Sequence, residues 1–137
     1  MNKKKLKYRV TYLEMNSKPN FDWPKNLKHK LSILLAESFP AWYFLFFYKQ
    51  VGKNYYWTDW LRKSEDEIDE FVNDKNVLLY TLIKDGWPVG FYMLDYRKKD
   101  ICDLSFFGLV DEVIGIGLGK YLLQTAILTA WDSKKIK

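Results

Sequence analysis

Hydrophobic and polar positions alternate in four stretches of the chain, and this alternation is typical of half-buried β-strands. The four stretches are residues 7–15, 76–83, 89–97 and 101–110. The turn-forming run DGWP at residues 85–88 separates the second stretch from the third, which predicts a β-hairpin. The pattern therefore predicts one N-terminal strand and a later block of three strands.

Elsewhere the apolar residues recur every three or four positions, which is typical of amphipathic helices. The helices predicted in this way span residues 26–37, 41–51, 65–73 and 120–131. The third helix begins with Ser64 and three acidic residues, which has the form of a capping box. The first helix is an open assignment, because Ile33 and Leu35 also suit a short strand.

The order of these elements is strand, two or three helices, three strands and a helix, which predicts an α+β domain with a largely antiparallel sheet covered by helices. A length of 137 residues leaves room for a single domain, so we treat residues 1–137 as one unit. The most apolar run, residues 39–48, is about half of the roughly 20 residues that a membrane-spanning helix needs. We therefore expect a buried helix there and no membrane partner.

The composition is that of a soluble globular protein, with 48% hydrophobic and 28% charged residues. The net charge of +5 comes from lysines near the two ends of the chain. These are Lys3, Lys4, Lys5, Lys7, Lys134, Lys135 and Lys137. We interpret them as solvated tails and predict no nucleic-acid partner.

The single cysteine, Cys102, and the single histidine, His29, exclude both an intrachain disulfide and a Cys/His metal site. We therefore expect no metal and a reducing, cytoplasmic location. Residues 6–15 are too polar to form the apolar region of a signal peptide.

The segment DEVIGIGLGKYLL, residues 111–123, is the most informative part of the sequence. A predicted strand leads into three alternate glycines, and a helix follows at once. Glycines allow close backbone approach to a ligand, and the first turn of a helix offers unpaired N–H groups, so this arrangement suits a pyrophosphate. A Rossmann fingerprint would need glycine where Lys120 stands. A Walker A loop would need glycine in place of Ile114 and Ser or Thr in place of Tyr121.

This segment resembles the acetyl-CoA loop of GCN5-related N-acetyltransferases (GNAT), whose pattern is Gln or Arg, two residues of any type, Gly, any residue, then Gly or Ala. The glycines match that pattern, while Ile114 replaces the usual Gln or Arg. The hairpin TLIKDGWPVGFYML and the strand CDLSFFGLV resemble the second to fourth strands of the family. The resemblance covers about residues 76–131 and looks like a bacterial branch of the superfamily.

The resemblance implies a GNAT-like fold that binds acetyl-CoA as cosubstrate and acetylates a primary amine by direct attack, the acceptor being a small molecule or a peptide. By register with the family, main-chain groups of the fourth strand and of the loop would hold the cosubstrate. These residues are Phe107, Gly108, Leu109, Ile114, Gly115, Ile116, Gly117, Leu118, Gly119 and Lys120. Most of the binding in this family comes from main-chain N–H groups.

The resemblance also suggests catalytic and acceptor residues. Asp103 falls on the strand where some members place the carboxylate that deprotonates the amine, although a structural role is about as plausible. Trp57, Asp59 and Trp60 fall where the family lines its acceptor pocket, and packing is the alternative role for the two tryptophans. Cys102 is expected to be a buried filler rather than a nucleophile.

The family continues beyond this helix with a further strand, helix and hairpin, and the helix usually carries the tyrosine that protonates the leaving thiolate. The resemblance thus predicts a C-terminally incomplete GNAT domain, with a strand edge at residues 101–110 open to self-association. The alternative function is a remnant that binds CoA or a partner chain without turnover.

Overall fold

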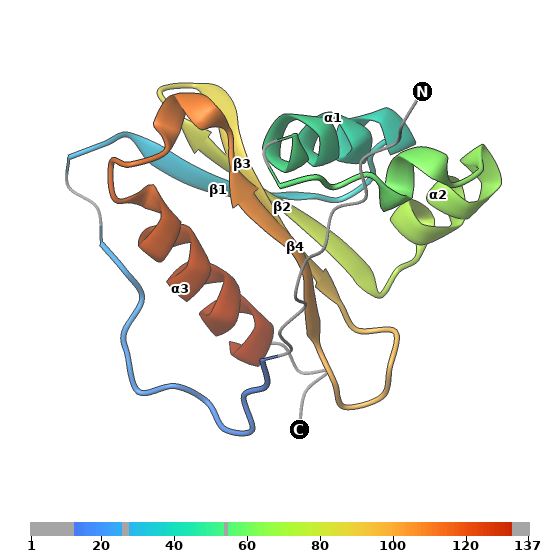
Figure 1. Ribbon diagram of the computed structural model, residues 1–137. Helices are drawn as coiled ribbons and strands as arrows, with labels where there is room; N and C mark the ends of the chain where they lie inside the picture. Colours follow the sequence, from blue (N-terminus) through green and yellow to red (C-terminus); the bar gives the residue numbers. More distant parts are fainter. Residues whose placement is uncertain (1–12, 26–27, 54, 133–137) are drawn as a thin grey trace.

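The computed structural model describes residues 13–25, 28–53 and 55–132. The strands are β1 (Leu31–Ala36), β2 (Val77–Lys84), β3 (Trp87–Asp95) and β4 (Asp103–Leu109). The helices are α1 (Ala41–Gly52), α2 (Glu65–Asn73) and α3 (Leu118–Asp132), with short 3-10 turns η1 (Asp59–Arg62) and η2 (Asp111–Val113). The strands form an antiparallel sheet in the order β1-β2-β3-β4, with α1 and α2 on one face and α3 on the other (Figure 1). The predicted α+β class with a largely antiparallel sheet is confirmed.

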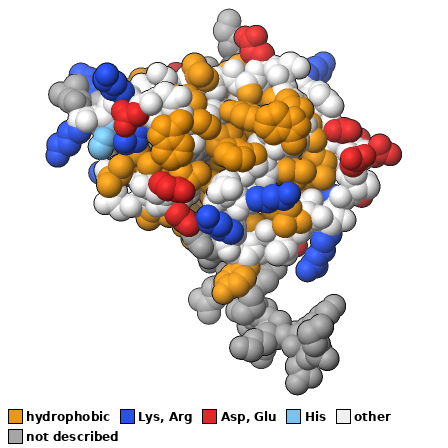
Figure 2. Space-filling view, turned by 90° about the horizontal axis from the view of Figure 1, so that it is seen from above, with side chains coloured by type: hydrophobic (Ala, Val, Ile, Leu, Met, Phe, Trp, Pro, Cys, Tyr) orange, Lys and Arg blue, Asp and Glu red, His pale blue; other side chains and the backbone are white. Residues whose placement is uncertain are grey.

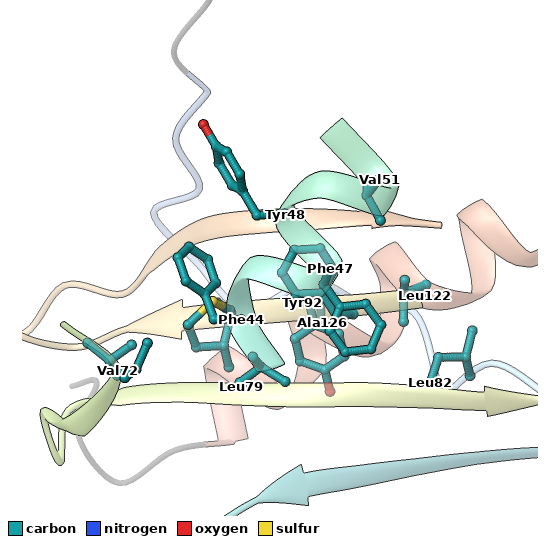
Figure 3. Close-up of a cluster of buried hydrophobic side chains, with 14 of the residues drawn as sticks. Phe44, Phe47, Tyr48, Val51, Val72, Leu79, Leu82, Tyr92, Leu122 and Ala126 are labelled. Atoms are coloured by element: carbon teal, nitrogen blue, oxygen red, sulfur yellow. The ribbon is translucent and has the colours of Figure 1, made fainter. Parts of the chain in front are cut away.

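The core lies on both faces of the central strands (Figure 3). On the first face, Phe44 and Phe47 of α1 are fully buried, and the Phe47 ring stacks on Phe91 of β3 at 4.9 Å. On the second face, Leu122 and Ala126 of α3 are fully buried. Burial of each such Phe or Leu side chain stabilises the fold by about 1.5–3 kcal/mol. The central strands are therefore well packed on both faces and give a rigid support to the loops at their ends.

The β2–β3 hairpin closes through two residues only. Asp85 and Gly86 both have positive φ, at 52° and 89°, which is the pattern of a type I′ turn. The four-residue turn expected at 85–88 was therefore too long, since Trp87 and Pro88 belong to β3. Proline is tolerated there because the pairing of β2 with β3 is irregular at this point, between Leu82 and Ile83.

The helix predicted at residues 26–37 is wrong, and the strand that Ile33 and Leu35 suggested is present instead. Residues 31–36 pair with β2 along their whole length. The leucines in this stretch match a helical spacing by themselves, but the open edge of β2 offers a ladder of main-chain partners. Tertiary pairing thus decides the local structure here.

The remaining helices agree with the sequence patterns. The helices expected at 41–51 and 65–73 are confirmed, and Ser64 caps α2 by accepting a 3.2 Å hydrogen bond from the Glu67 N–H. The last helix begins at Leu118, two residues before the expected position. Of the strand expected at residues 7–15, positions 7–12 lie outside the described residues, and positions 13–15 are not in a strand.

Candidate functional site

The glycine-rich loop adopts a backbone that other residues rarely take. After β4 the chain passes through η2 and reaches Gly115 and Gly117, whose φ angles are 89° and 87°. Both values lie in the left-handed region, where a Cβ is strained and glycine is not. Open space surrounds both glycines, with no heavy atom within 4 Å of a Cβ built there. The glycines are therefore required by the path of the chain and not by neighbouring side chains.

This path brings a set of main-chain donors to the end of β4. Because α3 begins at Leu118, the N–H groups of its first turn have no partner within the helix. Within the described part of the chain, no main-chain carbonyl outside the helices and strands accepts from the N–H groups of residues 115–117. Donors at a helix N-terminus, where the helix dipole is positive, favour an anionic ligand such as a pyrophosphate.

The loop is anchored at both ends. Leu118 is fully buried under the sheet, and Lys53 at the end of α1 forms a 3.4 Å ion pair with Asp111 of η2. Between these anchors, Ile114 and Ile116 are exposed by 49% and 45%. An exposed isoleucine at position 114 gives the loop an apolar surface where the family pattern has a polar side chain.

Among the described strands, β4 is the last of the sheet, and its outer edge offers two of the three main-chain groups that the sequence suggested. The N–H of Val110 donates to the Val89 carbonyl at 2.9 Å, so strand alternation also directs the N–H of Gly108 toward β3. The N–H groups of Phe107 and Leu109 consequently face the open edge. Gly108 has a different reason to be glycine, because a Cβ there would collide with Val51 of α1.

A β-bulge in β4 builds the other side of the site. Met93 pairs with Phe106 while Leu94 pairs with Leu104, which leaves Ser105 as the additional residue. The bulge turns Phe106 toward α1 and α2. An aromatic cluster surrounds it, consisting of Phe44, Tyr48, Trp57, Trp60 and Phe71. Sequence alternation missed Phe106 because a bulge reverses the faces of the residues that follow it.

The structure places Trp57 and Trp60 in this cluster, with ring centroids 5.9 and 6.0 Å from that of Phe106. The hydroxyl of Tyr48 accepts a 3.1 Å hydrogen bond from the Trp60 N–H. Burial raises the pKa of the Tyr48 hydroxyl. Asp59 lies between the two tryptophans in η1 and is exposed. The tryptophans thus have a clear packing role, and Asp59 is the polar group beside them.

Asp103 begins β4 and is exposed. It pairs with Asp95, so its side chain lies on the sheet face that α1 and α2 cover, the same face as Phe106. The distance along the strand from Asp103 to Phe107 is roughly 13 Å at 3.3 Å per residue. The structure therefore does not bring Asp103 next to the loop, but it does place Asp103 on the side of the aromatic cluster.

Cys102 is half-buried, and burial raises the pKa of its thiol to about 11. The thiolate is therefore disfavoured near neutral pH, in agreement with the expected filler role. Within the described ranges, no three His, Cys, Asp or Glu side chains gather in a way that could hold a metal ion. The helices described here are all too short or too polar to cross a membrane.

The comparisons with known proteins concern the fold. No family model matches the sequence, and no curated protein sequence matches it. The structure is similar to an aminoglycoside acetyltransferase from an uncultured soil metagenomic sample in complex with sisomicin, with a TM-score of 0.60 and 12% identity over 78% of this chain and 73% of that chain. It is also similar to a GNAT family acetyltransferase from Elizabethkingia anophelis with acetyl-CoA bound, with a TM-score of 0.51 and 16% identity over 74% of this chain and 57% of that chain.

A third similar structure is another aminoglycoside acetyltransferase from a soil metagenomic sample, with a TM-score of 0.53 and 8% identity over 74% of this chain and 72% of that chain. The architecture is therefore similar to that of these acetyltransferases. More narrowly, the chain has the fold of the GNAT acetyltransferases.

Proposed function

We propose that this protein is an N-acetyltransferase that transfers an acetyl group from acetyl-CoA to a primary amine by direct attack. The observation that carries the proposal is the left-handed backbone at Gly115 and Gly117, which delivers the N-terminus of α3 to the end of an open-edged strand. A pyrophosphate fits such a terminus, and an extended pantetheine arm fits a strand edge. The solved structures of the same fold are acetyltransferases, and one has acetyl-CoA bound.

The proposed roles follow from the positions of the main-chain groups. The N–H groups of residues 115–120 hold the pyrophosphate, whereas the Ile114 N–H already donates to the Asp111 carbonyl at 3.2 Å. The N–H groups of Phe107 and Leu109 reach the pantetheine arm and the acetyl carbonyl. The amine nitrogen attacks the thioester carbon, the C–S bond breaks, and the electron pair leaves on the sulfur. The same N–H groups stabilise the negative charge that develops on the carbonyl oxygen.

We assign the removal of the ammonium proton to Asp103. Because its carboxylate lies roughly 13 Å along β4 from Phe107, the proton passes along a chain of several water molecules rather than through one. Trp57, Asp59 and Trp60 line the acceptor side, where a carboxylate beside aromatic rings suits a cationic amine. The acceptor is a small molecule or a peptide. Removal of the Asp103 carboxylate in Asp103→Asn should lower turnover by roughly 10²-fold, with acetyl-CoA affinity unchanged.

Two measurements, made one after the other, test the proposal. Calorimetric titration should show that acetyl-CoA binds at least about tenfold more tightly than S-acetylpantetheine, which lacks the pyrophosphate. Thiol release from acetyl-CoA is then followed with a panel of primary amines. Equal affinity for both ligands would remove the loop from the site.

A second candidate is a domain that binds CoA without turnover. It is favoured by the main-chain character of the candidate site, because the N–H groups before α3 and along the outer edge of β4 can hold CoA without any catalytic side chain. Acetyl-CoA binding without thiol release for any amine in the panel would select this candidate.

A further inference from the structure

The sheet has a second edge, at β1, far from the candidate site. Only β2 runs beside β1 in the described structure (Figure 1). The Asp85 N–H donates to the Lys30 carbonyl at 3.1 Å, so strand alternation directs the main-chain groups of residues 30, 32, 34 and 36 toward β2. The N–H and C=O groups of Leu31, Ile33 and Leu35 consequently point away from the sheet.

This edge carries none of the features that usually protect an edge strand. Natural edges are blunted by charged residues, by proline or by bulges. Strand β4 has two of these features, a bulge at Ser105 and a charge at Asp103. Strand β1 reads LSILLA, with no charge and no proline, and its pairing with β2 is regular throughout.

Apolar side chains are exposed on both sides of the strand. Leu34, on the face of α1, is 57% exposed, and Leu35, on the face of α3, is 42% exposed. The helices pack chiefly over β2, β3 and β4, and none of them packs extensively on β1 in the described structure. Hydrophobic side chains also form a broad patch on the face seen from above (Figure 2). A partner strand can therefore approach β1 without a helix in its path.

The charges that flank β1 favour a second copy of this chain as the partner. Lys28 and Lys30 precede the strand and Glu37 follows it. If two copies of β1 pair antiparallel, the basic end of each copy lies beside the acidic end of the other. A parallel pairing would instead place like charges together.

We propose that β1 pairs antiparallel with β1 of a second copy of this chain, about a two-fold axis at Ile33. A two-fold axis perpendicular to the sheet keeps each face on its own side, so residues of equal parity must lie opposite each other. In this register Ile33 faces Ile33, and Leu31 faces Leu35. All outward main-chain groups of these three residues then find partners, and the sheet continues through the dimer.

Light scattering coupled to size-exclusion chromatography tests the interface on the full chain at high micromolar concentration. The unaltered protein should elute as a dimer. Leu34→Lys should reduce the measured mass to half, with its circular dichroism spectrum retained. The matched variant Leu104→Lys places the same charge on the β4 edge, where Leu104 is 38% exposed, and should remain dimeric. A monomeric unaltered protein, or a dimer that dissociates with Leu104→Lys instead, would overturn the proposal.

Cross-linking tests the register. In this register Ser32 lies opposite Leu34 at a non-hydrogen-bonded position, where Cα atoms are about 4.5 Å apart, within disulfide range. Ser32→Cys and Leu34→Cys are made separately in a Cys102→Ala background and oxidised. A covalent dimer should form only when the two proteins are mixed. A dimer from Leu34→Cys alone would place the axis at Leu34 and refute this register.

Discussion

The two sides of β4 are built by different means. On the side of α1 and α2, rings from α1, η1, α2 and the segment before η1 fill the space around Phe106, and the ring centroids of Trp60 and Phe71 are 4.5 Å apart. At the loop before α3, the side chains of Ile114 and Ile116 are about half exposed, and the proposed binding groups are main-chain N–H groups. One region depends on side-chain volume, and the other depends on backbone angles.

The difference predicts that the two regions fail in different ways. Removing volume from the aromatic cluster should cost stability, because the neighbours of the lost ring cannot fill the cavity completely. Straining the loop should cost ligand affinity, because the N–H groups would turn away from one another while the core stays packed. Stability and acetyl-CoA affinity are therefore the two measurements that separate the regions.

The largest expected effect is on the aromatic cluster. Phe44 is fully buried and contacts the rings of Trp60, Phe71 and Phe106. Phe44→Ala should lower the free energy of unfolding by about 3–5 kcal/mol, measured by urea denaturation. Phe46→Ala is the control on the same helix, since Phe46 is 39% exposed and should cost much less. Equal losses for the two variants would contradict the packing described for α1.

The second effect is on the loop. Gly117→Val forces a β-branched residue to a φ of 87° and should abolish detectable acetyl-CoA binding, a loss of at least about 10²-fold. The strain should lower stability by no more than about 1–3 kcal/mol. Calorimetric titration measures the affinity, and urea denaturation measures the stability.

Gly86 provides the matched control for this variant. Its φ is 89°, and a Cβ there also meets nothing within 4 Å, but it lies in the β2–β3 turn. Gly86→Val should lose a similar amount of stability and keep its affinity for acetyl-CoA. If both variants lost affinity equally, the effect would arise from general destabilisation and the loop would have no special role.

The same contrast explains what could be predicted from the sequence. The loop was predicted at the correct residues, because a left-handed backbone requires glycine locally and the glycines at 115 and 117 show this directly. Strand β1 was assigned first to a helix, since its pairing with β2 comes from residues almost fifty positions away. Phe106 was missed because the bulge at Ser105 leaves no mark in the alternation.

Gly108 was expected among the main-chain groups that hold the cosubstrate, and the structure adds a packing reason for the glycine itself. Its glycine character reflects the close approach of Val51, a contact between a helix and a strand that are far apart in the chain. Packing of this kind depends on how α1 crosses the sheet, and no local pattern encodes that crossing.

A smaller effect is expected from the ion pair at the far end of the cluster. Arg97 donates to both carboxylate oxygens of Asp95 at 2.8–3.0 Å, and its guanidinium lies 5.1 Å from the Phe71 ring centroid. Burial acts to raise the pKa of Asp95, but the hydrogen bonds and charge of Arg97 outweigh it, so the pKa is lowered. The pKa of this carboxyl is about 3.9 in the unfolded chain and lower in the folded protein, so the ion pair stabilises the fold at pH values above about 3.9. This stabilisation is lost as the pH falls through the pKa of the folded protein.

Asp95→Asn should therefore lower the free energy of unfolding by about 1 kcal/mol at pH 7. The loss is no larger because Arg97 is half-exposed and water screens the ion pair. The difference in the free energy of unfolding between this variant and the unaltered protein should shrink as the pH falls below about 4. Urea denaturation at a series of pH values measures this convergence. Arg97→Met should converge in the same way, and a constant difference down to low pH would exclude the ion pair as the cause.

The smallest effect is expected at the start of α2, which carries Phe71 into the cluster. The Ser64 hydroxyl oxygen accepts a hydrogen bond from the Glu67 N–H, and it lies 3.3 Å from the Glu67 carboxylate. Both contacts are exposed, so the N-cap of α2 depends on the Ser64 side chain alone and not on packing. Ser64→Ala should cost about 0.5–1 kcal/mol in urea denaturation, whereas Ser64→Asp retains an acceptor and should cost little. Neither variant should change the affinity for acetyl-CoA, because α2 and the loop before α3 lie on different sides of the sheet (Figure 1). A change in that affinity would mean that the aromatic cluster and the loop are coupled through β4, and the contrast between the two regions would have to be abandoned.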